Sequence, residues 1–391
     1  MILERELELY IHIPFCRKKC LYCDFLSFTG CHEDDIHDYV RALQGEIRQK
    51  APEASGRKIT SIFIGGGTPG SINPDYIGDI MDTIRYFYDV DENAEITVEV
   101  NPGIFMKEGF RIYKASGINR VSVGLQSADD SELHTLGRIH DYSGFLRTYE
   151  SALKAGYDNI NIDIMTAIPG QTLQSLEKTL SQVTKLRPAH ISAYSLMIEE
   201  GTPFYEKYGE DDRRRKEGLE SGHLPSEETV CAMDVLTNEY LGAHGYNRYE
   251  ISNYTKKGKE CRHNIGYWTG KDYLGFGIGS ASLFNGIRST NTKDMAKYIK
   301  LISKAEDPAE ESFELSRKDR MEEFMFLGLR MIEGVSRRDF EGRFNAPIEA
   351  IYGDVINRLA ASGMILPSSG MIRLTEDGIN LSNIVLAEFL L

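Results

Sequence analysis

The repeated alternation of short apolar segments with longer amphipathic ones most constrains how this chain can fold. Strand-like segments lie at residues 9–13, 61–64, 95–100, 120–125, 159–165 and 190–195. Helical periodicity occupies the intervals, at residues 35–49, 74–88, 105–115, 131–136, 143–155 and 173–185. A strand followed by a helix, repeated six times, is typical of a parallel sheet with crossover helices. The sequence therefore predicts an α/β fold built on a partial (β/α)6 TIM-like barrel, with its chemistry at the carboxyl ends of the strands.

The rest of the chain has a different character and predicts two further regions. Residues 209–228 are polar and charged, so we expect a solvated loop there, followed by a helix at about 227–242. The barrel core is expected to cover residues 1–225, and a mixed segment that holds the only tryptophan covers 226–315. Three short helices and a small hairpin then predict a mainly helical, winged-helix-like domain at 316–391.

Composition excludes several classes of protein. The formal charge of −14 argues against a nucleic-acid partner, so the winged-helix-like region is expected to be a packing or docking module. Apolar runs are too short for a membrane span, and the acidic N-terminus does not resemble a signal peptide. Six cysteines in 391 residues are too few for a secreted disulfide scaffold. We therefore expect a cytoplasmic protein.

Three cysteines follow the first strand at C-x3-C-x2-C spacing: Cys16, Cys20 and Cys23. Soft thiolate ligands suit iron–sulfur chemistry, and three of them can hold three irons of a [4Fe–4S] cube. The fourth iron is then open, and the amino and carboxylate groups of S-adenosylmethionine can chelate it. The alternative is a zinc site completed by His12, Cys31 or another distant residue.

A glycine-rich loop, Gly65-Gly66-Gly67-Thr68-Pro69, follows the second strand. Successive glycines let a backbone approach a ligand closely. No Gly-Lys-Ser/Thr follows, so the loop is not a phosphate-binding P-loop. It is either a plain tight turn or the wall that grips the methionyl end of the cofactor.

Polar residues interrupt three apolar strands near their carboxyl ends: Glu99, Gln126 and Asp163. A carboxylate buried there costs several kcal/mol unless it is hydrogen-bonded. Ribose hydroxyls are candidate partners for Glu99, and Arg138 is a candidate ion-pair partner for Asp163. The alternative is an internal polar network that only holds the barrel together.

Taken together, these motifs resemble the radical S-adenosylmethionine proteins of the HemN and HemW family. The resemblance runs from about Tyr10 to the C-terminus. It implies a [4Fe–4S] cluster on the three cysteines and S-adenosylmethionine as cofactor. By the family pattern, the cofactor site is lined by Tyr10, Tyr22, Gly66, Gly67, Thr68, Glu99, Gln126, Arg138 and Asp163. In the coproporphyrinogen oxidases of this family, some counterparts of the last three face a second S-adenosylmethionine.

Two features separate the branches of the family. The oxidase pattern adds a fourth cysteine where this chain has Phe25, and a longer arm than the fifteen residues before Cys16. The run His263-Asn-Ile-Gly-Tyr-Trp268 matches the H-N-x-x-Y-W motif of the heme-chaperone branch. This match implies that His263 ligates heme iron, with Cys261 as a second possible ligand. A core histidine beside a structural tryptophan is the alternative.

The resemblance implies a heme-binding chaperone that carries the cluster and S-adenosylmethionine and inserts heme into apo-proteins such as respiratory cytochromes. The expected partners are heme, an apo-cytochrome or other heme-protein client, and an electron donor, with peripheral membrane contact through the client. The rival class is an enzyme. It would be an oxygen-independent coproporphyrinogen III oxidase of porphyrin biosynthesis, or a radical enzyme that opens or methylates heme.

Overall fold

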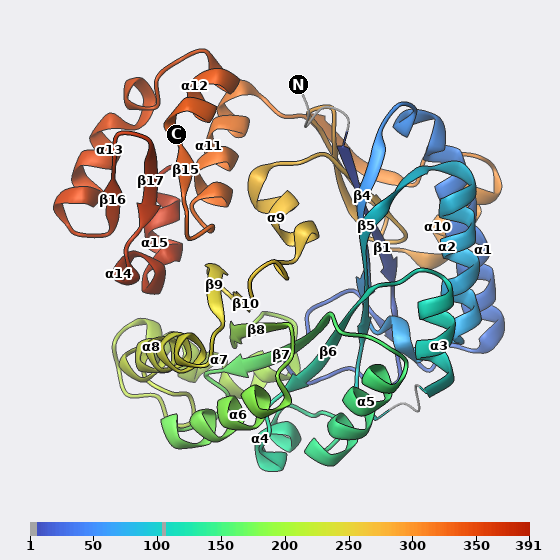
Figure 1. Ribbon diagram of the computed structural model, residues 1–391, viewed down its shortest axis with the longest axis horizontal. Helices are drawn as coiled ribbons and strands as arrows, with labels where there is room; N and C mark the ends of the chain where they lie inside the picture. The colour runs from blue at the N-terminus through green and yellow to red at the C-terminus, as the bar shows by residue number, and fades with distance from the viewer. Residues whose placement is uncertain (1–5, 104–106) are drawn as a thin grey trace.

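The computed structural model describes residues 6–103 and 107–391, and one long curved sheet runs through it (Figure 1). Within the described residues this sheet has 12 strands. Six of them pair in parallel and in chain order: β1 (Glu6–Ile13), β4 (Lys58–Gly66), β5 (Asp89–Val100), β6 (Arg120–Gln126), β7 (Ile160–Thr166) and β8 (His190–Ser195). The six predicted strands and the partial (β/α)6 barrel are confirmed.

Each predicted crossover helix is present on the outside of the sheet (Figure 1). The helices are α1 (Glu33–Lys50), α2 (Pro74–Phe87), α3 (Lys107–Ala115), α4 (Asp130–Thr135), α5 (Tyr142–Lys154) and α6 (Leu173–Leu186). The helix predicted at 105–115 is described only from Lys107, because residues 104–106 lie outside the described part of the chain.

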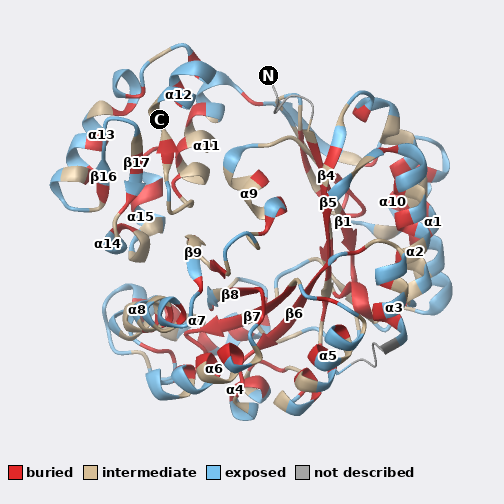
Figure 2. Cartoon of the chain, viewed as in Figure 1, coloured by how far each residue is buried: buried red, intermediate tan, exposed pale blue. Residues whose placement is uncertain are grey.

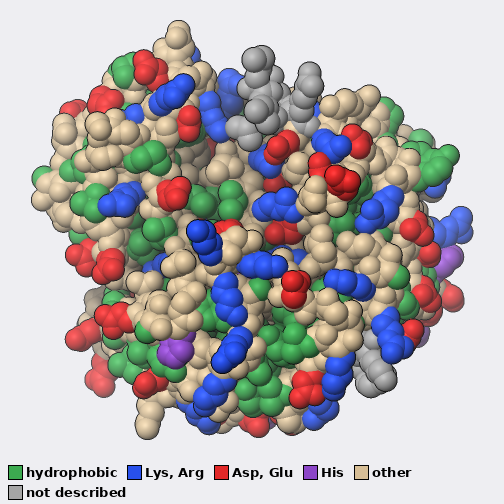
Figure 3. Space-filling view, viewed as in Figure 1, with side chains coloured by type: hydrophobic (Ala, Val, Ile, Leu, Met, Phe, Trp, Pro, Cys, Tyr) green, Lys and Arg blue, Asp and Glu red, His purple; other side chains and the backbone are tan. Residues whose placement is uncertain are grey.

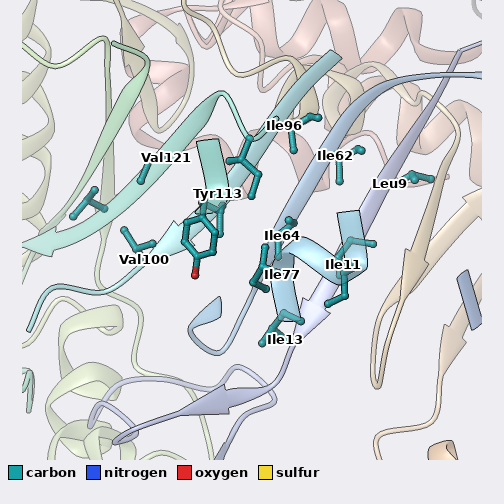
Figure 4. Close-up of a cluster of buried hydrophobic side chains, with 14 of the residues drawn as sticks. Leu9, Ile11, Ile13, Ile62, Ile64, Ile77, Ile96, Val100, Tyr113 and Val121 are labelled. Carbon is teal, nitrogen blue, oxygen red and sulfur yellow. The ribbon is translucent and has the colours of Figure 1, made fainter. Parts of the chain in front are cut away.

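The alternation of side chains along each strand divides the barrel wall into an outer apolar face and an inner polar face. On β1, Leu9, Ile11 and Ile13 are fully buried and lie beside Ile77 of α2 in the layer between sheet and helices (Figure 4). The residues between them point into the barrel. Both faces of the strands are therefore buried, as expected for a parallel sheet covered by helices (Figure 2).

One sequence-based prediction is wrong. The charged stretch predicted as a loop at 209–228 begins inside a helix, α7 (Pro203–Lys216), and only its second part is irregular. Thr202 caps this helix by accepting a hydrogen bond from the Tyr205 N–H. Asp212 and Arg215 are buried and pair with each other at 2.6 Å, so charged residues occupy the inner face of the helix. Their pairing, which charge counting along the sequence does not reveal, allows the helix to pack.

The mixed segment extends both edges of the sheet. At one edge β11 (Tyr273–Phe276) pairs in parallel with β1 and continues through β12 (Ala281–Phe284), β13 (Ile287–Asn291) and β14 (Ala309–Glu314). At the other edge β10 (Asn253–Thr255) and β9 (Asn247–Glu250) follow β8. The helices of this segment are α8 (Glu227–Ala243), which the sequence predicted, α9 (Arg262–Thr269) and α10 (Met295–Ser303).

The C-terminal region has a hydrophobic core of its own, which includes Phe340, Tyr352 and Phe389. Its elements are α11 (Arg317–Gly328), β15 (Val335–Ser336), α12 (Arg337–Phe344), α13 (Glu349–Ala361), β16 (Ile365–Pro367), β17 (Met371–Leu374), α14 (Glu376–Asn380) and α15 (Ser382–Ala387). Three helices with a small antiparallel sheet form the expected winged-helix-like arrangement. In Figure 1 this region faces the barrel across α9.

Candidate cofactor site

The three cysteines lie on a loop that directly continues β1. Short strands β2 (Phe15–Cys16) and β3 (Phe28–Thr29) pair in parallel and close the loop at its base. The Phe28 N–H donates to the Pro14 carbonyl at 2.7 Å, which holds the base together. Cys16, Cys20 and Cys23 are all half-buried free thiols. The fold therefore presents three reduced sulfurs at the carboxyl end of the first strand.

A cavity of about 470 Å³ opens beside this loop, at the carboxyl ends of the barrel strands. The predicted residues that line it are Cys16, Cys20, Tyr22, Cys23, Gly66, Gly67, Thr68, Glu99, Gln126, Arg138 and Asp163. Tyr10 and His263 are not among the lining residues. The Tyr10 ring lies inside the barrel, stacked on Phe63, with its hydroxyl 3.0 Å from His12 Nδ1. The structure thus gathers residues from 16 to 163 around one cavity.

The glycine loop packs against the base of the cysteine loop. The N–H groups of Gly67 and Thr68 donate to the carbonyls of Ile13 and Phe15 at 2.9 and 2.8 Å. Gly66 has a φ of +114°, and a Cβ at this position would lie 2.6 Å from the His12 ring. The backbone can therefore follow this path only without side chains, which explains the glycines physically.

The carboxyl groups of Glu99 and Asp163 both line the cavity. Burial, assisted by the negative charge of Asp163, raises the pKa of Glu99 to about 8. Burial also raises the pKa of Asp163. Near neutral pH Glu99 therefore holds a proton, and a cationic ligand that binds beside it would favour release of that proton.

Asp163 does not pair with Arg138, contrary to the sequence-based prediction. Its oxygens accept hydrogen bonds from Ser122 Oγ at 3.1 Å and from Asn161 Nδ2 at 2.7 Å. The positive charge that acts on it comes from Arg120, which is buried inside the barrel. The prediction failed because strand order alone does not tell which cation lies opposite a carboxylate.

Arg138 instead supports the cysteine loop. Its guanidinium donates to Cys20 Sγ at 3.4 Å, to Asn101 Oδ1 at 2.7 Å and to the Gly124 carbonyl at 2.8 Å. Asn101 in turn donates to Thr68 Oγ1 at 2.7 Å, and that hydroxyl lies 3.5 Å from Cys16 Sγ. One hydrogen-bonded chain therefore links two of the three sulfurs and fixes the position of the cysteine loop against the barrel.

The sequence reasoning missed Asn101 and also Tyr194, whose ring lines the cavity from the end of β8. The rule that identified the glycine-rich loop and the acidic residues would have found both, because each of them stands at the carboxyl end of a barrel strand. Gln126, which was predicted, has a φ of 70°. A non-glycine residue in this region is strained, and such strain occurs often at functional sites.

Comparison with known proteins agrees with this geometry. Residues 10–183 match the family described as Radical SAM superfamily, and residues 315–381 match the HemN C-terminal domain. The chain is 35% identical to "Heme chaperone HemW" of Bacillus subtilis (strain 168) over 97% of this chain and 98% of that protein. It is 31% identical to "Heme chaperone HemW" of Escherichia coli (strain K12), over 98% of each chain. The chain belongs to the HemW family of radical S-adenosylmethionine proteins.

The fold of the HemW family is shared with an enzyme. The structure of coproporphyrinogen III oxidase (HemN) from Escherichia coli superposes with a TM-score of 0.84, at 23% identity, over 99% of this chain and 91% of that one. At this identity the similarity concerns the fold. Among the described residues, no helix is both long enough and apolar enough to cross a bilayer.

Membership of this family implies a [4Fe–4S] cluster and S-adenosylmethionine, and the donor set fits them. Three thiols line a cavity that also offers a glycine wall, a hydrogen-bonding hydroxyl at Thr68 and a half-buried carboxyl at Glu99. A zinc site fits poorly, because both ring nitrogens of His12 lie 3.0 Å from other groups, Tyr10 Oη and the Leu26 carbonyl.

His263 of the H-N-x-x-Y-W motif lies at the opposite end of the barrel. Its ring is 1% exposed, with Nδ1 2.8 Å from Ser61 Oγ and Nε2 3.1 Å from Tyr267 Oη. Burial lowers its pKa to about 3, so the ring is neutral. Cys261 is also buried, and burial raises the pKa of its thiol to about 12. Ligation of heme iron by either residue remains a prediction. In the structure both side chains are buried inside the barrel.

Proposed function

We propose that this protein is a heme chaperone that binds heme and inserts it into apo-proteins such as respiratory cytochromes. The observation that carries the proposal is full-length similarity, at 31–35% identity, to proteins named heme chaperone HemW. The H-N-x-x-Y-W motif and Phe25 in place of a fourth cysteine support the same branch of the family.

We assign the resident cofactors to the cavity beside the cysteine loop. Cys16, Cys20 and Cys23 hold the [4Fe–4S] cluster, and Arg138 positions the loop through its contact with Cys20. We propose that the lining residues already named bind S-adenosylmethionine together with Tyr10, whose ring stacks on Phe63 inside the barrel. Together, the bound cluster and S-adenosylmethionine supply one-electron chemistry. The protein's own contribution is to orient the ligand and to exclude water from the depth of the cavity.

Glu99 gives this pocket a charge-dependent preference. Its carboxyl is neutral near pH 7 because burial raises its pKa to about 8. A ligand that carries an ammonium or sulfonium group favours the ionised form, so binding and proton release are coupled. The affinity for such a cationic ligand should therefore rise as the pH increases toward 8.

The proposal extends to the cellular setting. Six free cysteines, three of them beside the cavity, suit a reducing cytoplasm. We propose an electron donor for the cluster, a heme-protein client such as an apo-cytochrome, and peripheral membrane contact only through that client. The net charge of −14 favours partners other than nucleic acid.

The deciding experiment pairs two assays on the anaerobically reconstituted protein. The first measures hemin binding and the transfer of heme to an apo-cytochrome, and the second measures conversion of coproporphyrinogen III to protoporphyrinogen IX. We expect stable heme binding with transfer and no conversion. Repeated turnover of the porphyrinogen, with no transfer of heme, would instead identify an oxidase.

A further inference from the structure

A series of hydrogen bonds runs through the barrel from the cofactor cavity to the start of α9. At the cavity, Asp163 accepts a hydrogen bond from Asn161 Nδ2 at 2.7 Å. The other polar atom of that amide, Asn161 Oδ1, lies 2.6 Å from His190 Nδ1. The second ring nitrogen of His190 lies 2.9 Å from Tyr249 Oη, which accepts from the N–H of Cys261, the N-cap residue of α9, at 3.2 Å. We call these five residues the barrel network.

Each hydrogen bond of the barrel network has one direction. Because Asn161 Nδ2 donates to a carboxylate oxygen, Asn161 Oδ1 can only accept, so His190 Nδ1 carries a proton. Burial lowers the pKa of His190 well below its usual value, so the ring is neutral and its Nε2 accepts from the Tyr249 hydroxyl. Every donor therefore points toward Asp163, and hydrogen bonds aligned in this way polarise one another.

Strands β7 to β9 carry the network across the sheet. Asn161 of β7 is paired with His190 of β8, and both side chains are buried, whereas Tyr249 lies in β9 at the edge of the sheet. In Figure 1, β8 and β9 lie between β7 and α9. Figure 3 shows that side chains fill this space on the face in view. Glu8, which also lies against α9, makes no hydrogen bond to the network among the described residues.

The start of α9 also has contacts that do not involve the cavity. Glu95 Oε1 accepts from the His263 N–H at 3.3 Å and from Cys261 Sγ at 3.4 Å. Ser61 Oγ lies 2.8 Å from His263 Nδ1. Loss of the Tyr249 hydroxyl should therefore remove one contact that holds α9 and leave the helix docked on the barrel.

We propose that the barrel network couples occupancy of the cofactor cavity to the anchoring of α9, with His190 and Tyr249 as positioning residues. The proposal rests on the placement of S-adenosylmethionine in that cavity and adds a consequence of its binding. Asp163 lines the cavity, so a bound cation with hydroxyl groups competes with Asn161 for the carboxylate. A carboxylate that faces a further donor or a cation is a weaker acceptor for its first partner. Binding therefore weakens the network and loosens the start of α9.

The coupling acts equally in both directions, because the two effects measure one free energy. If S-adenosylmethionine loosens the start of α9 by a given factor, then release of α9 from the network tightens the binding of S-adenosylmethionine by the same factor. Damage to the barrel has the opposite sign, because it weakens the binding. The sign of the change in affinity therefore distinguishes coupling through Tyr249 from a merely structural role of this residue.

The first test uses the anaerobically reconstituted wild type. Hydrogen exchange of the Cys261 amide is followed by mass spectrometry with and without saturating S-adenosylmethionine. The ligand should make this exchange about fivefold faster, the lower end of the usual range of coupling between two sites. The amides of α13 in the C-terminal region are the internal control and should not change. Equal or slower exchange at Cys261, in protein that binds the ligand by isothermal titration, would overturn the coupling.

The second test removes the hydroxyl that joins Cys261 to His190. Isothermal titration of Tyr249→Phe should show S-adenosylmethionine bound about fivefold more tightly than in the wild type. Tyr254→Phe is the matched control, because Tyr254 is buried in the neighbouring strand β10 and its hydroxyl has no hydrogen-bond partner among the described residues. It should keep the wild-type affinity. Equal or weaker binding by folded Tyr249→Phe contradicts the proposal, and the wild-type exchange experiment decides if this variant does not fold.

The outcomes separate this coupling from the proposals on which it rests. A wild type that binds no S-adenosylmethionine would overturn both the placement of the cofactor and the coupling. Binding that leaves the exchange of the Cys261 amide unaltered would overturn the coupling alone. Failure to transfer heme to an apo-cytochrome, with the expected changes in exchange and affinity present, would overturn the proposed function and support the coupling.

Discussion

The two ends of the barrel use similar residues in opposite ways. At the carboxyl ends of the strands, Glu99 and Asp163 line an open cavity together with the cysteines. At the amino ends, α9 closes the barrel, and His263 and Glu8 are buried 3.6 Å apart behind it. Ionisable residues in barrel strands therefore do not by themselves mark a ligand site. What matters is whether a helix covers them.

Removing a cluster ligand should give the largest effect, because the cluster depends on all three thiolates at the open end of the barrel. The reconstituted wild type should hold about four irons and four sulfides per chain. Alanine at Cys16, Cys20 or Cys23 should abolish the iron–sulfur absorbance, whereas Cys31→Ala and Cys231→Ala should retain it. Metal and sulfide analysis after anaerobic reconstitution provides the measurement. Zinc in place of iron in the wild type would contradict the site.

His263→Ala tests the closed end. Loss of the ring leaves Ser61 Oγ and Tyr267 Oη without their partner and opens a cavity, so the free energy of unfolding should fall by about 2–4 kcal/mol. Urea unfolding of the apo-protein measures this, and His37→Ala, an exposed histidine of α1, is the control. The iron–sulfur absorbance should not change. Unaltered stability combined with a lost or shifted Soret band would instead support His263 as a heme ligand.

Glu99→Ala should reduce the affinity for S-adenosylmethionine by about 1–3 kcal/mol, the cost of removing the partner of a buried polar group. The cluster should remain, because Glu99 does not ligate it. Isothermal titration of the reconstituted protein provides the measurement, with Glu92→Ala, an exposed residue of the same strand, as control. Unchanged affinity with easier unfolding would assign Glu99 to a structural network.

The smallest expected effect is a difference in pH dependence between the two ends. Burial raises the pKa of Glu8 and of Glu99 to about 8, above the value of 4.5 for an exposed glutamate. Below about pH 4.5 each carboxyl is protonated in both the folded and the unfolded protein, so its contribution to the free energy of unfolding is fully present. As the pH rises from about 4.5 to 8, only the unfolded protein ionises readily, and this contribution is lost. The slope is at most about 1.4 kcal/mol per pH unit for each group.

Histidine 263 acts with the opposite sign, because its pKa is lowered to about 3 and its contribution is lost only as the pH falls below about 6.5. The free energy of unfolding measured between pH 6.5 and 8 therefore reports the two carboxyl groups without a contribution from His263. Glu8→Gln and Glu99→Gln should each flatten the slope in this range. Saturation with S-adenosylmethionine should remove only the part that Glu99 contributes. An equal effect of the ligand on Glu8 would show that the two ends are not separate.

Much of the fold followed from local pattern. The six strands and six helices were predictable because apolar periodicity within each segment decides its burial, and the winged-helix-like region for the same reason. Helix α7 was not, since its inner face carries the Asp212–Arg215 pair in addition to apolar side chains. The edge strands β9–β14 were too short and too irregular to give a clear period.

In the candidate site, the cysteine spacing, the glycine loop and Glu99 were visible because each is a short motif at the end of a strand. The partner of Arg138 was not, because the Arg138–Cys20 contact joins residues 118 positions apart. The position of His263 depends on Ser61, 202 positions away. A motif gives the identity of such a residue but not the element that will cover it.

The sequence by itself determined the barrel, the order of its strands and the residues delivered to their carboxyl ends, because these depend on periodicity and spacing within single β/α units. The tertiary structure decided which end of the barrel is open. Only the docking of α9 between the barrel and the C-terminal region buries His263 and places Trp268 on the wall of a cavity between them. Burial, charge and access at these positions arise from contacts between distant segments, which no local pattern encodes.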